Sequence, residues 1–320
     1  MIDVNEERVA NICKRLKLLK IPLDSFTNPD YYPVKGSLED IARYFMFMVA
    51  IDHRTSYRGV SYEEIVNGKV YHGADLLYRL GITKYKENPE FFSPQNMAKI
   101  TVENVKAWLN YGRAKIWDIK VRTMLLKDLG FKLVKLYKGK VLNLLAESKG
   151  YLKRRGRGLV NSLKIFKAYE DPVEKKAYLL VKFLERRKII QIRDHEHVEI
   201  PVDNHLTRIA FRLGIVNLSR KLMNLIVSKR HLTFEDDVII RLTVRKAYKF
   251  LSMKASISPL YLDDLLWSLG RKCCTKPLPK CDQCKVLGYF SCPLKEICRG
   301  YRDKNYAKLT EHTYVKTWYY

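Results

Sequence analysis

The cysteines near the C-terminal end constrain the fold of this chain more than any other feature. Six of its seven cysteines lie between Cys273 and Cys298. Their spacing is C-x6-C-x2-C from Cys274 to Cys284, followed by C-x5-C from Cys292 to Cys298. Thiolates at such short spacings hold a soft metal or an iron–sulfur cluster, and zinc bound by four thiolates is the direct competitor. We therefore expect this segment to fold around a metal centre.

The charge balance indicates a polyanionic partner. The 320 residues include 60 Lys and Arg against 34 Asp and Glu, a formal net charge of +26. Such an excess favours nucleic acid before membrane, and the alternative is a merely soluble basic surface. No apolar run reaches the length of a membrane span, and the first residues lack signal-peptide character. We expect an intracellular protein of the cytoplasm or nucleoid, where cysteines serve as metal ligands more often than as disulfides.

Apolar residues recur at helical spacing through most of the chain, which predicts an all-α fold. The capping-box sequence Ser37-Leu38-Glu39-Asp40 opens one helix, which ends at a polar cluster containing His53 and Arg54. Another helix begins near Glu170-Asp171-Pro172 and runs to Glu185. A chain of this length buries a full core, and we expect it to form two lobes.

The densest basic segment is Lys153-Arg154-Arg155-Gly156-Arg157-Gly158. One interpretation is a solvated loop. The other is a phosphate grip, because arginines and glycines beside a helix start bring side chains and backbone N–H groups to an anion. The sequence leaves both open.

Asp203 begins an amphipathic helix. An apolar run, Ile200-Pro201-Val202, precedes it, and Gly214 is placed to cap the far end. The helix has an apolar face made of Leu206, Ile209, Ala210 and Leu213. Asp203 therefore occupies the N-cap position. The simpler interpretation is a capping residue, and the functional one is a carboxylate held over a binding cleft.

Two of these stretches resemble the helix-hairpin-helix DNA glycosylases of the endonuclease III and adenine-mismatch glycosylase group. Pro201 to Arg208 is similar to that family's V-D-T-H-x-x-R segment. The five cysteines fit its C-x6-C-x2-C-x5-C loop at the following positions: Cys274, Cys281 and Cys284 for the first three, and Cys292 and Cys298 for the last pair. The family has four cysteines, so either Cys284 or Cys292 is surplus.

The resemblance spans about residues 37–300 and implies a fold. It implies a six-helix barrel lobe at 37–195 with a degenerate hairpin. It also implies a second helical lobe, built from 1–36 and 196–320, that carries a [4Fe–4S] cluster in the loop 273–298, with zinc as the alternative. The cluster would shape a DNA-binding loop, and Asp203 would be the catalytic carboxylate.

The sequence departs from that family at the hairpin. The family's motif is L-P-G-V-G with a lysine two residues later, whereas this chain reads Glu170-Asp171-Pro172-Val173-Glu174-Lys175-Lys176, without either glycine. Those glycines let backbone N–H groups approach a phosphate. Lys176 falls at the lysine position and is the candidate Schiff-base nucleophile. The alternatives are a surface lysine on phosphate and the neighbouring Lys175.

The implied function is a DNA glycosylase of base excision repair. It would flip a damaged or mismatched base out of double-stranded DNA and cleave its N-glycosidic bond, with Asp203 activating water or, for AP lyase activity, the Lys176 amine. We expect a monomer without membrane contact. Candidate DNA contacts are His53, Arg54, Lys153, Arg154, Arg155, Arg157 and Lys175, and candidate base-pocket aromatics are Tyr44, Phe45 and Tyr57. The alternatives are a non-catalytic DNA-binding protein of the same fold, or an N-glycosylase acting on RNA or a modified nucleoside.

Overall fold

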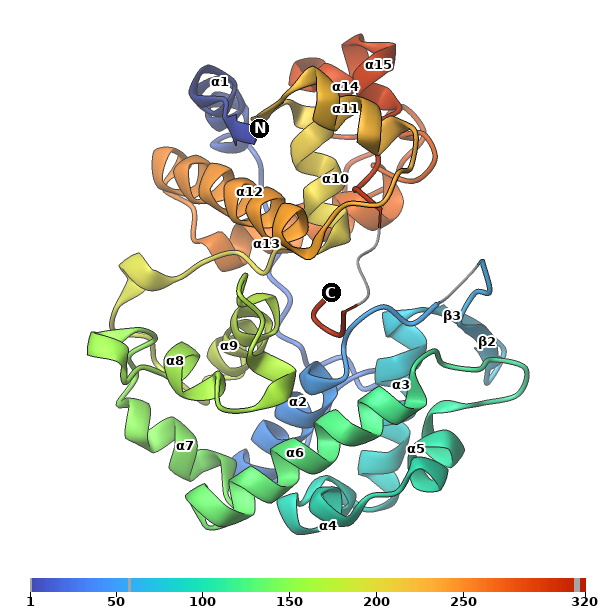
Figure 1. Cartoon of the computed structure of the whole chain (residues 1–320), viewed down its shortest axis with the longest axis vertical. Coiled ribbons are helices and arrows are strands. Elements are labelled where there is room, and N and C mark those ends of the chain that lie inside the picture. Colours follow the sequence, from blue (N-terminus) through green and yellow to red (C-terminus); the bar gives the residue numbers. More distant parts are fainter. Residues whose placement is uncertain (1, 57–58, 314–316) are drawn as a thin grey trace. The chain divides into compact units, whose positions relative to one another are not determined.

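The computed structural model describes residues 2–56, 59–313 and 317–320, and most of them lie in helices, as predicted (Figure 1). The chain divides into two compact units. Unit 1 comprises Met1–Leu23 and Val198–Thr317, and unit 2 comprises Asp24–His197 and Trp318–Tyr320. None of the helices in the described ranges has the length and apolar character needed to cross a membrane. The barrel and cluster-lobe assignments stay predictions.

Unit 1 is built from helices joined to one short two-stranded sheet. Its elements are β1 (Ile2–Val4), α1 (Glu6–Leu16), α10 (Asn204–Leu213), β4 (Val216–Leu218), α11 (Arg220–Val227), α12 (Phe234–Ala255), α13 (Pro259–Lys272), α14 (Arg299–Arg302) and α15 (Lys304–Ala307). The first strand pairs antiparallel with the strand that follows α10, with Ile2 opposite Leu218. The N-terminal strand is therefore tied to the end of the helix that Asp203 begins.

The predicted limits of α10 are confirmed. Asp203 is the N-cap, and its carboxylate accepts the N–H of Leu206 at 2.8 Å. Gly214 ends the helix at φ 75°, a left-handed conformation that glycine adopts without a Cβ penalty. The four apolar side chains predicted to face inward are all buried, namely Leu206, Ile209, Ala210 and Leu213. Local hydrogen bonds thus set both ends of α10, and burial of its apolar face holds it in the unit.

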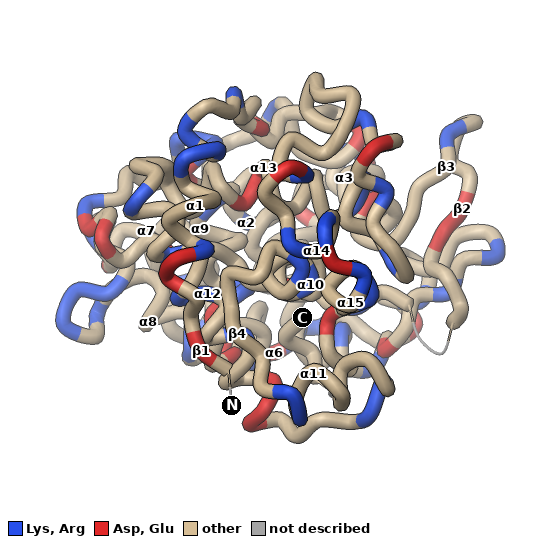
Figure 2. Tube along the Cα trace, turned by 90° about the horizontal axis from the view of Figure 1, so that it is seen from above, with Lys and Arg blue, Asp and Glu red and all other residues tan. Residues whose placement is uncertain are grey.

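In its described residues, unit 2 combines helices with the β-hairpin of β2 and β3. Its elements are α2 (Leu38–Ala50), β2 (Glu63–Val66), β3 (Lys69–His72), α3 (Ala74–Glu87), α4 (Pro94–Lys99), α5 (Val102–Leu109), α6 (Ile119–Tyr137), α7 (Val141–Ser148), α8 (Leu159–Leu163) and α9 (Lys175–Arg186), with short 3-10 turns η1 (Pro89–Phe92), η2 (Arg154–Gly156), η3 (Lys167–Tyr169) and η4 (His195–His197) between them. In unit 1, a further turn, η5 (Lys295–Ile297), precedes α14. Figure 2 shows Lys and Arg distributed along the whole trace, which agrees with the charge balance of the sequence.

The core of unit 2 surrounds α2. The predicted capping box is confirmed, since the Ser37 hydroxyl accepts the Asp40 N–H and the Asp40 carboxylate accepts the Ser37 N–H. From Tyr44 onward every residue of α2 is fully buried. Tyr44 and Phe45 therefore belong to the core, which corrects their assignment to a base pocket, and Tyr57 lies outside the described residues. A helix buried on all sides fixes the loop that follows it, at His53 and Arg54.

Candidate functional site

The Asp203 carboxylate is half-buried at the N-terminus of α10. One carboxylate oxygen caps the helix by accepting the N–H of Leu206. Two residues later, His205 is partly buried, and burial lowers the pKa of its imidazole. The His205 Nδ1 lies 2.9 Å from Nη2 of Arg208, and because a guanidinium only donates, Nδ1 accepts. His205 is thus a neutral imidazole with its proton on Nε2.

Two arginines on one face of α10 hold the cysteine loop. Arg208 is 2% exposed, and it donates to the carbonyls of Cys274 at 2.7 Å and Gly270 at 2.9 Å. Arg212 is fully buried and donates to three carbonyls, those of Leu309, Thr275 and Pro277, and to the Cys274 sulfur at 3.4 Å. The Asp203 helix and the cysteine loop, which are far apart in the sequence, form one structure through these contacts.

An acidic side chain balances part of this charge. Glu311 accepts from Arg208 Nη1 at 2.7 Å and pairs with Lys276 at 2.5 Å. Burial would raise the pKa of Glu311, but the attraction of Arg208 and Lys276 is larger and lowers it to about 2. The carboxylate therefore stays ionised at every physiological pH.

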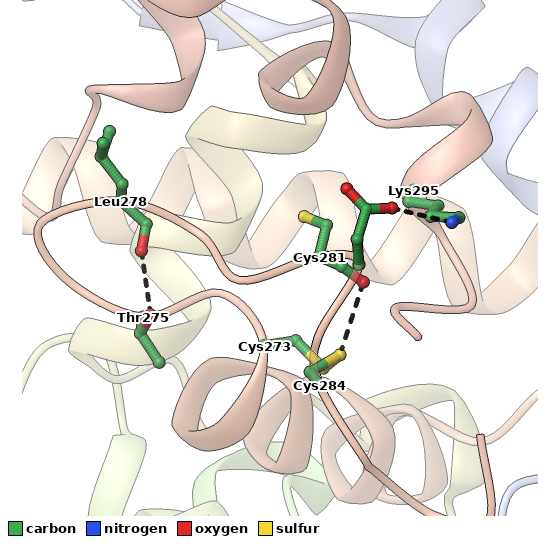
Figure 3. Close-up of a disulfide and its surroundings, with 7 residues drawn as sticks. Cys273, Thr275, Leu278, Cys281, Cys284 and Lys295 are labelled. Atoms are coloured by element: carbon green, nitrogen blue, oxygen red, sulfur yellow. Dashed lines mark hydrogen bonds and ion pairs between the residues drawn. A yellow bond between two sulfur atoms is a disulfide. The ribbon is translucent and has the colours of Figure 1, made fainter. Parts of the chain in front are cut away.

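The cysteine loop contains a disulfide between Cys273 and Cys284 (Figure 3). This pairing corrects two expectations. Cysteines of this chain were expected as metal ligands rather than disulfides, and Cys284 was among the candidate ligands. A sulfur committed to a disulfide is not a thiolate, so it does not ligate a metal in this structure. Between the two candidates for the surplus cysteine, the structure therefore sets Cys284 apart and leaves Cys292 with the other thiols.

Four free thiols line one small cavity against α10. They belong to Cys274, Cys281, Cys292 and Cys298, and the cavity is completed by Arg212 and apolar side chains such as Ile209 and Leu294. In the described ranges no group of three His, Cys, Asp or Glu side chains is arranged to hold a metal ion. Four thiols line one small cavity, and Arg212 donates to the sulfur of Cys274, so a metal centre in this loop stays a prediction.

In unit 2, the predicted nucleophile Lys176 is completely buried. Its Nζ donates to the Ala50 carbonyl, the last of α2, at 2.6 Å, and lies 3.4 Å from Nδ1 of His53. Burial lowers the pKa of Lys176 well below its usual value, and the cations of Lys175 and Arg122 act in the same direction. Burial likewise lowers the pKa of His53. Burial thus disfavours the charged forms of both the amine and the imidazole.

Several predicted DNA contacts are engaged inside unit 2. His53 is 3% exposed, and Lys175 is buried with its Nζ on the Asp52 carbonyl at 3.0 Å. Lys153 pairs with Glu174 at 2.7 Å. The side chains of Arg154, Arg155 and Arg157 are exposed, and that of Arg54 is half-buried. Contact with DNA stays a prediction for all seven, and solvent exposure permits it most directly at the three exposed arginines.

The sequence did not identify the role of the aromatic tail, and the structure seats its last residues on unit 2. The Tyr320 carbonyl accepts the N–H of Arg54 at 2.8 Å, and the Trp318 indole donates to the Lys167 carbonyl at 3.0 Å. The Tyr319 hydroxyl contacts Glu170 at 3.4 Å, and burial together with Glu170 raises the pKa of that hydroxyl to about 12. The aromatic content of the segment is the signal from which a docked tail could have been predicted.

These observations define a mostly helical protein with a capped aspartate beside a cysteine loop in one unit and a buried lysine of lowered pKa in the other. The chain belongs to a family described as queuosine salvage protein, whose model matches residues 53–279, more than half of its length. This family differs from the endonuclease III group that the motifs resemble.

Two further comparisons add little. A search of curated proteins finds no match. A similar solved structure is the 8-oxoguanosine complex of an 8-oxoguanine DNA glycosylase from Pyrobaculum aerophilum, which is 16% identical and covers 83% of this chain and 89% of its own, with a TM-score of 0.44. A likeness at that level does not establish a shared fold.

Proposed function

We propose that this protein is an N-glycosidase that releases the base from queuosine or its nucleotide, with Asp203 as the catalytic carboxylate. Membership of the queuosine salvage family is the observation that carries this proposal. Recovery of a modified base from a nucleoside requires cleavage of the bond between base and ribose. That chemistry needs a carboxylate near the sugar, and Asp203 is a half-buried one at the N-terminus of a helix.

The proposed reaction breaks the C1′–N9 bond, and the electron pair leaves with the base. The sugar acquires oxocarbenium character, which the Asp203 carboxylate stabilises electrostatically. Water then adds to C1′ and gives up a proton, and the departing base takes up one. Queuosine is a 7-deazaguanine nucleoside, so position 7 of its base is a carbon that does not accept a proton. Stabilisation of the sugar cation therefore carries more of the rate than it would for guanosine.

Base excision from DNA is the second candidate. The net charge of +26 and the stretch from Pro201 to Arg208 favour it. In that case the Lys176 amine, whose pKa burial lowers, supplies the nucleophile for an AP lyase, since an uncharged lysine attacks C1′ and forms an imine. The full burial of the Lys176 side chain requires the surrounding loops to open before a substrate reaches it.

A [4Fe–4S] cluster held by Cys274, Cys281, Cys292 and Cys298 is part of the proposal, with zinc as the alternative. Such a cluster would cross-link distant parts of the cysteine loop to one another beside α10. Cys292→Ser should remove bound iron and acid-labile sulfide, whereas Cys284→Ser should retain both. Equal loss from the two variants would contradict this ligand set, and zinc without sulfide in the wild-type protein would support the alternative.

One experiment tests the function directly. Purified protein is incubated with queuosine, its 5′-monophosphate, guanosine and duplexes bearing single lesions, and released base is identified by mass spectrometry, with and without borohydride. Release from queuosine or its monophosphate supports the proposal. Release from a lesion duplex alone would replace it with the second candidate, and a borohydride-trapped adduct there would assign the nucleophile to a lysine.

A further inference from the structure

The N-terminus of α9 already has anions of this chain beside it. The first N–H groups of a helix and its dipole attract anions, which is how helix ends grip phosphates. Here the Asp171 carboxylate, which is completely buried, accepts the N–H of Lys176 at 3.4 Å and that of Val173. The backbone donors that would meet a phosphate at this helix are thus partly occupied from within.

A second internal anion lies at the N-cap. Glu174 has a φ of 59°, a left-handed conformation that favours glycine, and stands where the hairpin motif of the resembled family has its second glycine. Its side chain is 3% exposed. The two carboxylate oxygens pair with the amines of Lys153 at 2.7 Å and Lys164 at 2.9 Å. The backbone therefore keeps the glycine-type turn, while a carboxylate replaces the open space that a glycine would leave.

The cations around this helix start are consequently engaged. Lys153 and Lys164 pair with Glu174, and Lys175 donates to the carbonyl of Asp52. A nucleic-acid backbone approaching α9 would have to displace Glu174 and meet the negative charge of the released carboxylate. A small substrate, whose base and sugar bind elsewhere, would not encounter this charge.

We propose that Asp171 and Glu174 are specificity-determining residues, which act as internal anions in the place of a nucleic-acid phosphate and disfavour polymeric backbones at this hairpin. This inference rests on the proposed function in assigning a small nucleoside or nucleotide as the substrate. It concerns binding, so its test does not depend on catalysis.

The test compares Glu174→Gly and Glu174→Gln with Glu147→Gln, which removes the same charge from an exposed residue of α7 in the same unit. Binding of each protein to an undamaged fluorescent duplex is measured by anisotropy over a range of salt concentrations. Both Glu174 variants should bind at least about tenfold more tightly than Glu147→Gln at low salt. The slope of the logarithm of the binding constant against the logarithm of the salt concentration should steepen by about one to two for these variants. The reason is that each additional phosphate that the protein neutralises adds about 0.9 to that slope.

Lys164→Gln provides a second measurement that leaves Glu174 paired with Lys153. Because Lys164 is assigned to Glu174 rather than to phosphate, its loss should leave wild-type duplex affinity and salt slope unchanged. A weaker, less salt-dependent Lys164→Gln protein would overturn the inference, as would folded Glu174 variants that bind no better than Glu147→Gln. If the protein releases base from queuosine but either contradicting binding result is found, only this inference is rejected. If duplex binding changes as expected but no base is released, only the proposed function is rejected.

Discussion

Helices α10 and α9 each have an aspartate close to their N-terminus and each bury basic side chains, yet the two sites differ in how those side chains are engaged. In unit 1, Arg208 and Arg212 satisfy the carbonyls and one sulfur of the cysteine loop, and Asp203 remains half-exposed. In unit 2, Lys175 and Lys176 donate to single carbonyls, and the aspartate itself is buried.

The difference follows from the chemistry of the side chains. A guanidinium keeps its charge and offers five donors, so α10 uses its arginines as permanent connections and leaves the carboxylate for another role. Burial lowers the pKa of a lysine, so α9 contains an amine whose protonation depends on its surroundings. We therefore keep Asp203 as the proposed residue for the sugar chemistry.

The largest expected effect is on catalysis by unit 1. Asp203→Asn should reduce base release by about 10²- to 10³-fold, because the amide no longer stabilises positive charge on the sugar. Asparagine also caps helices, so the melting temperature should change little. Asp3→Asn, at an exposed residue of β1, is the matched control. Near-normal turnover by Asp203→Asn would show that Asp203 is not the catalytic carboxylate and that the proposed chemistry does not take place at α10.

The next effect concerns the permanent connections of α10. Arg212→Met should lower the free energy of unfolding by about 3 kcal/mol or more, because it leaves the carbonyls of Leu309, Thr275 and Pro277 without their donor. Urea unfolding followed by circular dichroism measures this. Arg302→Met, at an exposed residue of α14, should stay within about 0.5 kcal/mol. A small effect at Arg212 would mean that the loop does not depend on α10.

The buried aspartate of unit 2 should show a pH signature. Burial raises the pKa of Asp171 from 3.8 to about 6 against the opposing N–H groups. Because the folded pKa is the higher one, Asp171 destabilises the fold increasingly as pH rises from about 4 through 6, by at most about 3 kcal/mol. Asp171→Asn should therefore gain stability over wild type at pH 7.5 and lose that advantage at pH 4. Parallel stability curves for the two proteins between these pH values would refute the assignment.

The smallest effect belongs to the docked tail. Trp318→Phe removes only the hydrogen bond from the indole to the Lys167 carbonyl and should cost about 1 kcal/mol in thermal unfolding. Trp318→Ala should cost more, because it also removes the ring that contacts Tyr319. Identical stability of the three proteins would show that the tail contributes nothing to unit 2.

Sequence reasoning succeeded where a structure depends on neighbours along the chain. Three local features illustrate this: the N-cap at Asp203, the glycine cap at Gly214 and the capping box at Ser37. Each joins residues three or four positions apart, so the local sequence is enough to predict the interaction. The mostly helical composition follows from the same local spacing. The family assignment came from the comparison with known families, because the motifs by themselves resembled another glycosylase group.

Interactions between distant positions required the tertiary structure. The sequence offered five cysteines for the four ligand positions of the resembled loop. In the folded loop, Cys284 forms a disulfide with Cys273, and the other four thiols line one cavity against α10. The sequence suggested that Lys176 is an accessible nucleophile. Its side chain is buried because its amine packs against the end of α2, more than a hundred residues earlier in the chain. In the sequence, Glu174 was a departure from the glycine of the resembled hairpin motif. The fold shows that its carboxylate pairs with Lys153 and Lys164.

The sequence by itself determined where α2 and α10 begin, because side-chain caps set those starts, but it placed the start of α9 near Glu170 instead of Lys175, where no side chain caps the helix. The tertiary structure decided which groups are paired, buried or neutral, because pairing and desolvation depend on what the rest of the chain places around them.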